Sequence, residues 1–152
     1  MDFELSEEMR MLADMAYKFA VKEIEPIAAE ADEQEHYTPE VRKKAGANGL
    51  IGSWIPEAYG GAGVGFLGNT IITEQLSRIC MGIGLNIVAA TFGCENLLYY
   101  GSEEQKKTYM PPVCAGDTVC AGAYTEPNAG PDVAGYKTRA LPDGDDSVLT
   151  GN

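Results

Sequence analysis

The sequence predicts a mainly helical domain over residues 1–117, followed by the opening strands of a β domain over residues 118–152. Two observations support this fold class. Apolar residues recur at three- and four-residue spacing through the first two-thirds of the chain, as they do on one face of a helix. After Gly116 the pattern changes to short β-like runs. With 152 residues, of which 45% are hydrophobic, the chain is long enough to bury a core.

Capping signals predict where the first two helices begin. Ser6 is a candidate N-cap before an amphipathic segment, which Pro26 either kinks or ends. Thr38 and Pro39 predict a second start, with Thr38 as the cap and the proline at the first helical position. The glycines over 46–49 predict its end.

Three further helices are expected before the strands. The first extends over about 67–79, and the next, over about 85–99, is apolar on nearly every side and is therefore predicted to be buried. The segment 102–105 has the form of a capping box and opens a short polar helix, which Pro111 and Pro112 are expected to close.

A glycine-rich segment, "GLIGSWIPEAYGGAGVG", separates the second and third helices. Its glycine spacing invites comparison with a dinucleotide-binding loop. Pro56 rather than a buried strand precedes the glycines, however, and no acidic residue ends a second strand about 20 residues later. We therefore expect a compact loop that crosses between helices.

The strands are expected over 118–125, about 133–141 and 147–150, with the turn "PDGDD" before the last one. A strand that ends at Gly151 and Asn152 with no later partner would leave an exposed edge, which folded proteins usually avoid. We expect from this that the sequence is the front part of a longer protein.

Composition argues against several classes of function. The net charge of −12, from 23 acidic and 11 basic residues, disfavours nucleic acid and anionic membrane surfaces as partners. We expect no signal peptide and no membrane insertion, because no apolar run near 20 residues stands out. The four cysteines lack metal-ligand spacing, so no metal is expected. They are interpreted as reduced and buried thiols of a soluble intracellular protein.

The stretch "AYTEPNAGPD", residues 123–132, is rich in hydrogen-bonding groups. Pro127 and Asn128 suit the centre of a turn, and Gly130 can take a positive φ. The amides of residues 128–130 would then converge on an acceptor or an anion. An ordinary hairpin-like connection is the alternative.

Two ionisable residues need an interpretation: His36, as a possible catalytic base, and Glu95, for its apolar surroundings. His36 lies in a polar segment and is better interpreted as part of a solvated surface. Glu95 lies within the apolar segment 85–99, so it must be paired, neutral, near a cavity or at a helix edge, and the sequence leaves these alternatives open.

Four segments, in chain order, carry a family resemblance: "EIEPIAAEAD", "GLIGSWIPEAYGGAG", "YGSEEQKKTYMPPVCAGD" and "AYTEPNAGPDVAGYKTRA". The second is similar to a G-L-x-G-x-x-x-P-E-x-Y-G-G pattern, the third to G-S-E-E-Q-K-x-x-Y-L-P and the fourth to T-E-P-x-A-G-S-D. In order and spacing they resemble the N-terminal part of the acyl-CoA dehydrogenase family of flavoenzymes. The resemblance covers essentially all 152 residues.

The resemblance implies an N-terminal helical domain, a middle β-barrel domain and a C-terminal four-helix bundle, with FAD at their junction. This chain resembles the first domain and the opening strands of the barrel, an α+β chain that is truncated. For a complete member, the resemblance implies oxidoreductase activity: α,β-dehydrogenation of an acyl-CoA thioester in fatty acid or carboxylic acid degradation. Electron transfer flavoprotein would be the electron acceptor. The family's catalytic glutamate lies on C-terminal helices, so no catalytic residue is assigned here.

The resemblance also implies site residues, position by position. Those expected to contact FAD are Gly122, Ala123, Tyr124, Thr125 and Gly130. Those expected to contact substrate are Leu85, Val88, Ala89, Phe92 and Pro131. Gly122 stands where the family usually has an aromatic residue, and Pro131 stands where it usually has a serine.

The complete protein is expected to be a cytoplasmic homotetramer, by the same resemblance. The chain alone is expected to be inactive and prone to associate through unfinished strand edges. A different class of function remains as the alternative: a non-catalytic helical interaction module that retains the fold.

Overall fold

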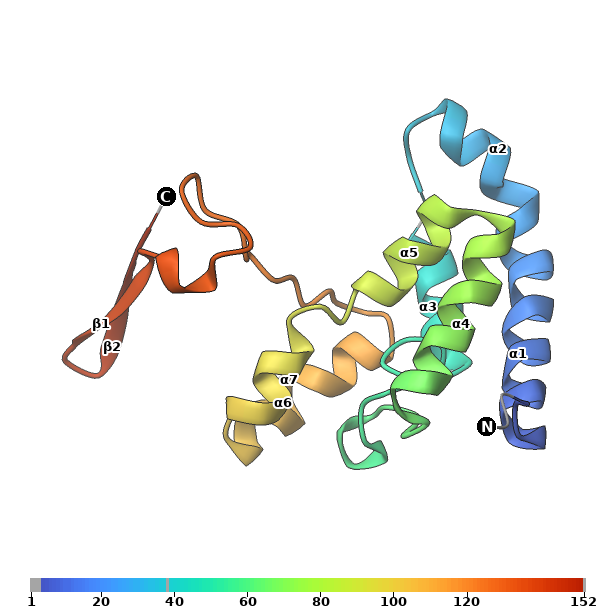
Figure 1. Ribbon diagram of the computed structural model, residues 1–152. Helices are drawn as coiled ribbons and strands as arrows, with labels where there is room; N and C mark the ends of the chain where they lie inside the picture. Colours follow the sequence, from blue (N-terminus) through green and yellow to red (C-terminus); the bar gives the residue numbers. More distant parts are fainter. Residues whose placement is uncertain (1–3, 38, 152) are drawn as a thin grey trace. The chain divides into compact units, whose positions relative to one another are not determined.

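The computed structural model describes residues 4–37 and 39–151. The chain forms two compact units, the first ending at Ala121 and the second beginning at Gly122 (Figure 1). The domain boundary between residues 117 and 118 stays a prediction, because compactness of the chain alone does not define a family's domain limits.

The first unit is helical. Its elements are α1 (Glu7–Phe19), the π-helical segment η1 (Ala20–Ile24), α2 (Glu25–Glu33), α3 (Pro39–Ala47), the short 3-10 helix η2 (Glu57–Tyr59), α4 (Gly65–Ile79), α5 (Met81–Ala89), α6 (Cys94–Tyr100) and α7 (Glu103–Cys114).

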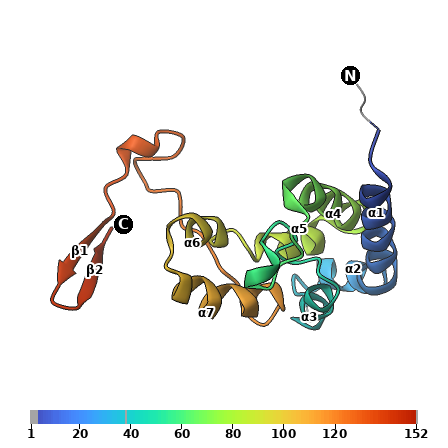
Figure 2. The ribbon, with the colours of Figure 1, turned by 90° about the horizontal axis from the view of Figure 1, so that it is seen from below.

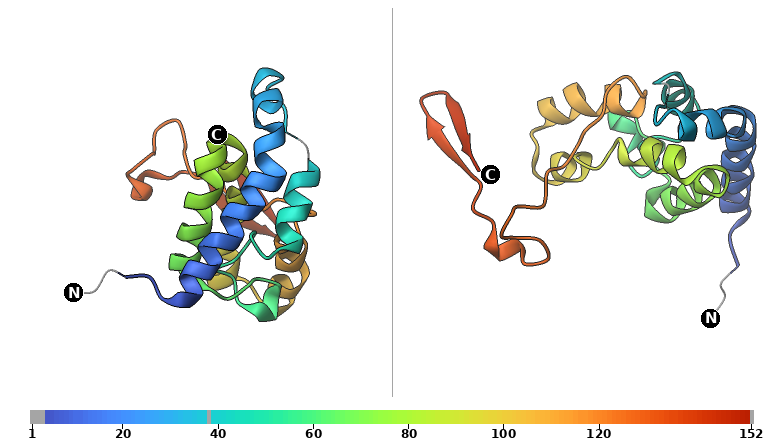
Figure 3. Two further views of the ribbon diagram at one scale, coloured as in Figure 1. Left: turned by 90° about the vertical axis from the view of Figure 1, so that its right-hand side faces the viewer. Right: turned by 90° about the horizontal axis from the view of Figure 1, so that it is seen from above.

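The first helix begins as predicted, since the Ser6 hydroxyl accepts a hydrogen bond from the amide of Met9 at 3.3 Å. Pro26 does not end it. The wider π turn precedes the proline, with the Glu25 amide bonded to the carbonyl of Ala20, and α2 continues α1 as one long rod (Figures 1 and 3). The structure therefore supports a bend rather than a stop.

The second helix, α3, starts at Pro39 as predicted, and the proposed cap Thr38 lies outside the described residues. It ends at Ala47, and Gly49 then takes a φ of 68°, which a glycine adopts without strain. The chain enters the glycine-rich loop, which is compact and holds η2, as the sequence indicated.

Two groups of buried side chains stabilise this unit. The larger is formed by α1, η1, α3, α4 and α5, with α4 packed between α1 and α5 (Figure 2). The smaller joins the glycine-rich loop to the α6–α7 pair; its buried members are Ile55, Cys94, Met110, Val113 and Cys114.

The prediction of a single buried helix over 85–99 is wrong in two respects. The segment is divided into α5 and α6 by a turn at 90–93, and several of its apolar side chains are exposed. Among the described residues, Met81–Tyr100 is also long and apolar enough to cross a membrane by length and composition, which the sequence expectation overlooked. A core helix passes the same test, and the inner side of α5 lies in the larger core.

The capping box of α7 is confirmed, because the Ser102 hydroxyl accepts from the Gln105 amide and the Gln105 side chain accepts from the Ser102 amide. The two prolines do not close this helix, which continues to Cys114. A proline removes its own donor and crowds the carbonyl four residues earlier, but its own carbonyl can still accept a hydrogen bond. The carbonyl of Pro111 still accepts from the Ala115 amide at 2.9 Å, so the last turn forms.

The second unit contains the 3-10 turn η3 (Val133–Gly135) and a hairpin of β1 (Arg139–Asp143) and β2 (Asp146–Thr150). The strands are antiparallel, with Arg139 opposite Thr150. They are joined by a two-residue turn in which Gly144 has a φ of 63°.

The predicted fold class, a mainly helical domain followed by opening strands, is confirmed. The last strand is close to its predicted position. The prediction of a strand over 118–125 is wrong, because these residues form no strand. Of the strand predicted over 133–141, only the last residues form one, within β1. A strand needs a partner for its backbone groups, and β1 and β2 pair with each other.

Candidate functional site

The residues expected to line an acyl pocket lie on α5 and in the turn after it. Leu85 and Ala89 are one helical turn apart and share a face. Leu85 is 48% exposed, Ala89 is half-buried, and Phe92, in the turn, is 57% exposed. Val88 is only 6% exposed and lies on the inner side of the helix. The structure thus leaves three of the four apolar side chains accessible to solvent, while Val88 is buried.

Hydrogen bonds fix the turn that carries Phe92. The buried Thr91 hydroxyl donates to the carbonyl of Val88 at 3.1 Å and accepts from the indole nitrogen of Trp54 at 3.3 Å. The Trp54 ring in turn stacks on Phe66, with ring centroids 5.3 Å apart. The glycine-rich loop and α4 therefore position the end of α5.

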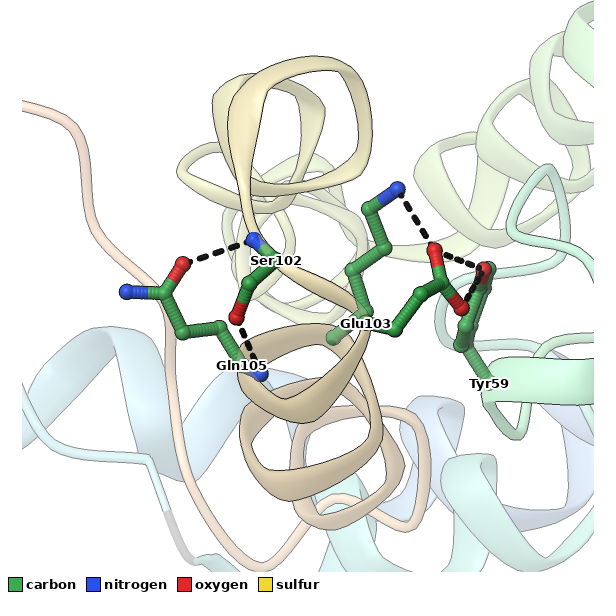
Figure 4. A network of polar contacts seen from close by, with 5 residues as sticks. Tyr59, Ser102, Glu103 and Gln105 are labelled. Carbon is green, nitrogen blue, oxygen red and sulfur yellow. Dashed lines mark hydrogen bonds and ion pairs between the residues drawn. The ribbon is translucent and has the colours of Figure 1, made fainter.

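A polar network ties η2 to α7 (Figure 4). The Tyr59 hydroxyl hydrogen-bonds to the Glu103 carboxylate at 2.9 and 3.1 Å, and the Lys106 ammonium lies 3.1 Å from the same carboxylate. The hydrogen bond to Glu103 raises the pKa of Tyr59, and the hydrogen bond from Lys106 is the main cause that lowers the pKa of Glu103. This network is structural. Sequence reasoning missed it, although its residues come from the "PEAYGG" and "GSEEQK" segments.

The turn in "AYTEPNAGPD" forms as predicted. Pro127 and Asn128 occupy its centre, and the flanking residues Glu126 and Ala129 exchange backbone hydrogen bonds at 2.9 and 3.2 Å. Gly130, which can take a positive φ, does not take one in this structure. The turn is closed by this pair of bonds before the chain reaches Gly130, so a left-handed residue is not required there.

The side chain of Glu126 holds this turn to a distant part of the same unit. Its two carboxylate oxygens accept from the backbone amides of Lys137 and Thr138 at 2.8 and 2.9 Å. Hydrogen bonds from the Thr138 side chain and then from the two amides lower the pKa of Glu126. A small cavity of about 210 Å³ lies beside the turn, lined in part by Glu126, Asn128 and Lys137.

The residues expected to contact FAD lie at the start of the second unit. Residues 122–125 are exposed and have neither helix nor strand, and Gly130 is half-buried while Pro131 is exposed. A Cβ on Gly122 would lie 2.2 Å from the Tyr124 ring, so an aromatic side chain at 122 would displace that ring.

The chemistry of these residues fits one edge of a flavin. Accessible backbone groups and the hydroxyls of Tyr124 and Thr125 are neutral donors and acceptors, as the carbonyls and nitrogens of an isoalloxazine edge require. No charged side chain stands between Gly122 and Thr125.

His36 and Glu95, the two ionisable residues interpreted from the sequence, are both exposed. His36 lies after α2 on the surface, as expected. Glu95 lies in the first turn of α6, which answers the question that the sequence left open: it is at a helix edge, where a carboxylate favours the helix dipole.

Comparisons with known proteins identify the family. The family model for "Acyl-CoA dehydrogenase, N-terminal domain" matches residues 6–117. The acyl-CoA dehydrogenase, short-chain specific, of Clostridium acetobutylicum is 40% identical over 153 residues, which are 100% of this chain and 40% of that protein. The chain therefore belongs to the acyl-CoA dehydrogenase family, and the predicted family membership is confirmed.

Solved structures agree with this assignment. A chain in the structure reported for the electron transferring flavoprotein of Acidaminococcus fermentans matches with a TM-score of 0.89 and 36% identity, over 99% of this chain and 40% of that one. Acyl-CoA dehydrogenase complexed with FAD from Bacillus anthracis matches with a TM-score of 0.84 and 34% identity, over 97% of this chain and 26% of that one. The chain spans about 40% of the length of the curated relatives that it matches first.

Proposed function

We propose that this chain is the N-terminal part of an FAD-dependent enzyme that introduces an α,β double bond into an acyl-CoA thioester, and that the chain alone is inactive. The observation that carries the proposal is the continuous match, over the whole chain, to relatives named acyl-CoA dehydrogenases. The family model covers residues 6–117. The match to the C. acetobutylicum relative covers the whole chain and so includes the turn at residues 126–129.

The proposal gives the exposed apolar side chains of α5 and of the turn after it the role of receiving the acyl chain. Leu85, Ala89 and Phe92 would contact it, and the buried Val88 would hold their helix in place. Removal of water from around an acyl chain by such side chains favours binding. Pro131 would lie nearer the thioester, where it offers a carbonyl but no amide donor.

The start of the second unit would hold the flavin edge. Bound FAD supplies an acceptor for the hydride that leaves the substrate. The residues assigned to hold it are Gly122, Ala123, Tyr124, Thr125 and Gly130, with backbone groups and the Thr125 hydroxyl as hydrogen-bonding partners. Glu126 would position them indirectly, because its clamp on residues 137–138 keeps the turn closed.

The proposal extends to partners and location. Electron transfer flavoprotein is proposed as the electron acceptor, supported by the match to the flavoprotein structure of A. fermentans. A homotetramer in the cytoplasm is proposed for the complete enzyme. The four cysteines of the present 152-residue chain, all among the described residues, are free thiols, which accords with a reducing compartment.

The test is to read the DNA downstream of codon 152 and to purify the product of the complete reading frame. We expect an in-frame continuation, a flavin absorbance band in the purified protein and reduction of an electron-accepting dye that depends on acyl-CoA. The 152-residue chain should show no dehydrogenation. A natural stop codon after Asn152 would overturn the proposal and favour the non-catalytic interaction module.

A matched pair of variants tests the acyl-binding surface in the complete enzyme. Phe92→Ala should shift the preferred substrate toward longer thioesters in a series of straight-chain acyl-CoAs, because it removes a ring that would shorten the pocket. Tyr100→Ala, at an aromatic residue of α6 that is 87% exposed, should leave the preference unchanged. Equal profiles for the two variants would show that Phe92 does not contact the acyl chain.

A further inference from the structure

Two cysteines that are distant in sequence lie side by side in the first unit. Cys94 begins α6, and Cys120 lies in the extended segment after α7. A pair of backbone hydrogen bonds joins this segment to the turn before α6: the Gly93 amide donates to the carbonyl of Cys120, and the Cys120 amide donates to the carbonyl of Ala90, both at 2.8 Å. The segment at Cys120 and the turn at 90–93 are thus held at the separation of paired strands, beside Cys94.

The side chains also meet. Gly93 leaves the space that the Cys120 sulfur occupies, since a Cβ on Gly93 would lie 2.6 Å from that atom. The Cys120 side chain packs against the smaller core, of which Cys94 is a fully buried member. Burial and then the neighbouring Cys120 thiol, with which it shares a hydrogen bond, raise the pKa of Cys94 to about 12.

The third cysteine of this region, Cys114, belongs to the same smaller core and is the least of the causes that raise the pKa of Cys94, but its hydrogen bond goes to another partner. The Cys114 thiol donates to the carbonyl of Tyr59 at 3.9 Å and packs against Gly52. Cys80 lies in the larger core region, away from the smaller cluster. Cys94 and Cys120 are therefore the pair that the backbone and the packing bring together.

We propose that Cys94 and Cys120 are a thiol-oxidation site that forms a reversible disulfide when the protein meets a peroxide. The proposal does not depend on dehydrogenase activity. It would join the start of α6 covalently to the segment that leads into Gly122, the first residue of the second unit.

The chemistry follows from the exposure of the two sulfurs. Cys120 is half-buried, so a peroxide can reach its side chain. The Cys120 sulfur attacks one peroxide oxygen and the O–O bond breaks. The departing hydroxyl takes the thiol proton and leaves as water, and Cys120 becomes a sulfenic acid. The Cys94 sulfur then attacks the Cys120 sulfur, the S–S bond forms, the S–O bond breaks, and the hydroxyl leaves with the Cys94 proton as a second water. Hydrogen peroxide is reduced, and the two thiols are oxidised. A dithiol reductant reverses the change by thiol–disulfide exchange.

The test treats the purified 152-residue chain with a small excess of hydrogen peroxide and then blocks the remaining thiols with an alkylating reagent. We expect a mass lower by two hydrogen atoms before alkylation, and a peptide map that joins the peptide of Cys94 to the peptide of Cys120. Dithiothreitol should separate them. The loop closed by the bond has roughly 25 residues, so the melting temperature should rise by roughly 10 °C on oxidation.

Variants identify the pair. Cys120→Ser, at a half-buried position, and Cys94→Ala should each abolish the cross-link and the oxidation-dependent rise in melting temperature. Cys114→Ser and Cys80→Ser should retain both. A Cys94–Cys114 cross-link, a cross-link between two chains, or sulfinic acid at Cys120 without a cross-link in the wild-type chain would each overturn the proposal.

Discussion

Replacement of Gly61 by alanine should disrupt the glycine-rich loop that positions Trp54 and Tyr59. A Cβ at residue 61 would lie 2.0 Å from the carbonyl oxygen of Ile55 and 2.6 Å from that of Gly52. Ordinary van der Waals contacts of a Cβ begin near 3.4 Å. Because both obstructing atoms belong to the backbone, no side-chain rotation relieves the overlap, and the loop must open by about 1 Å or more.

The expected loss is about 3 kcal/mol, at the upper end of the range for overpacking a closed site. Opening the loop also strains the hydrogen bonds that Gly61 and Gly63 donate to the carbonyls of Pro56 and Ile55. For a helical unit of this size, a loss of that order lowers the melting temperature by roughly 10 °C. Circular dichroism at a helix-sensitive wavelength, followed during heating and in a urea titration, measures both quantities.

Gly82→Ala is the matched control. A Cβ there has nothing within 4 Å, and residue 82 is helical in α5, where alanine is favoured over glycine by up to about 1 kcal/mol. It should melt at or above the wild-type temperature. If Gly61→Ala melts within about 2 °C of wild type, the reasoning from backbone proximity is refuted.

Three further changes test the core, the turn and the clamp. Ile87→Ala, at a fully buried position of α5, should lower the free energy of unfolding by about 3 kcal/mol, whereas Leu85→Ala on the exposed face should cost under about 1 kcal/mol; equal losses in urea titrations would refute the division of α5 into two faces. Thr91→Val removes the acceptor of the indole N–H and should cost about 1–2 kcal/mol. It should also shift the fluorescence of Trp54, the sole tryptophan, while Thr91→Ser should preserve that emission. The pKa of Glu126 is lowered on folding, so its clamp stabilises the second unit above the ordinary carboxyl pKa and is lost as the pH falls through the lowered value. NMR signals of the two clamped amides should therefore titrate with a midpoint below 4.5, and a midpoint at or above that value would contradict the clamp.

Local signals were sufficient for the beginnings of helices. Ser6, Pro39 and the capping box at Ser102 each act through groups within one helical turn, so their spacing in the sequence fixes the structure. The turn at Pro127 and Asn128 was predictable for the same reason. The family resemblance then added the domain layout, the cofactor and the expected site residues.

Features that depend on distant partners were not predictable from local pattern. The division of 81–100 into α5 and α6 depends on bonds to Trp54 and to Cys120, neither of which lies in the segment. The expected strand over 118–125 lacks a pairing strand within the described residues, although its composition suits one. The Glu126 clamp joins carboxylate and amides that are more than one turn apart in the chain, so no periodicity marks it.

The π turn over Ala20–Ile24 has a consequence for insertions and deletions among relatives. Its hydrogen bond, from Glu25 back to Ala20, spans one residue more than an α-helical bond does, so the rod of α1 and α2 holds one residue more than a regular helix would. Loss of one residue here would convert the turn to α-helix and leave Ala16 and Phe19 in the core. A one-residue loss within α1 would instead rotate the part of the helix beyond it by about 100° relative to the core. Deletion of one residue is therefore compatible with the core at this π turn, and not within α1.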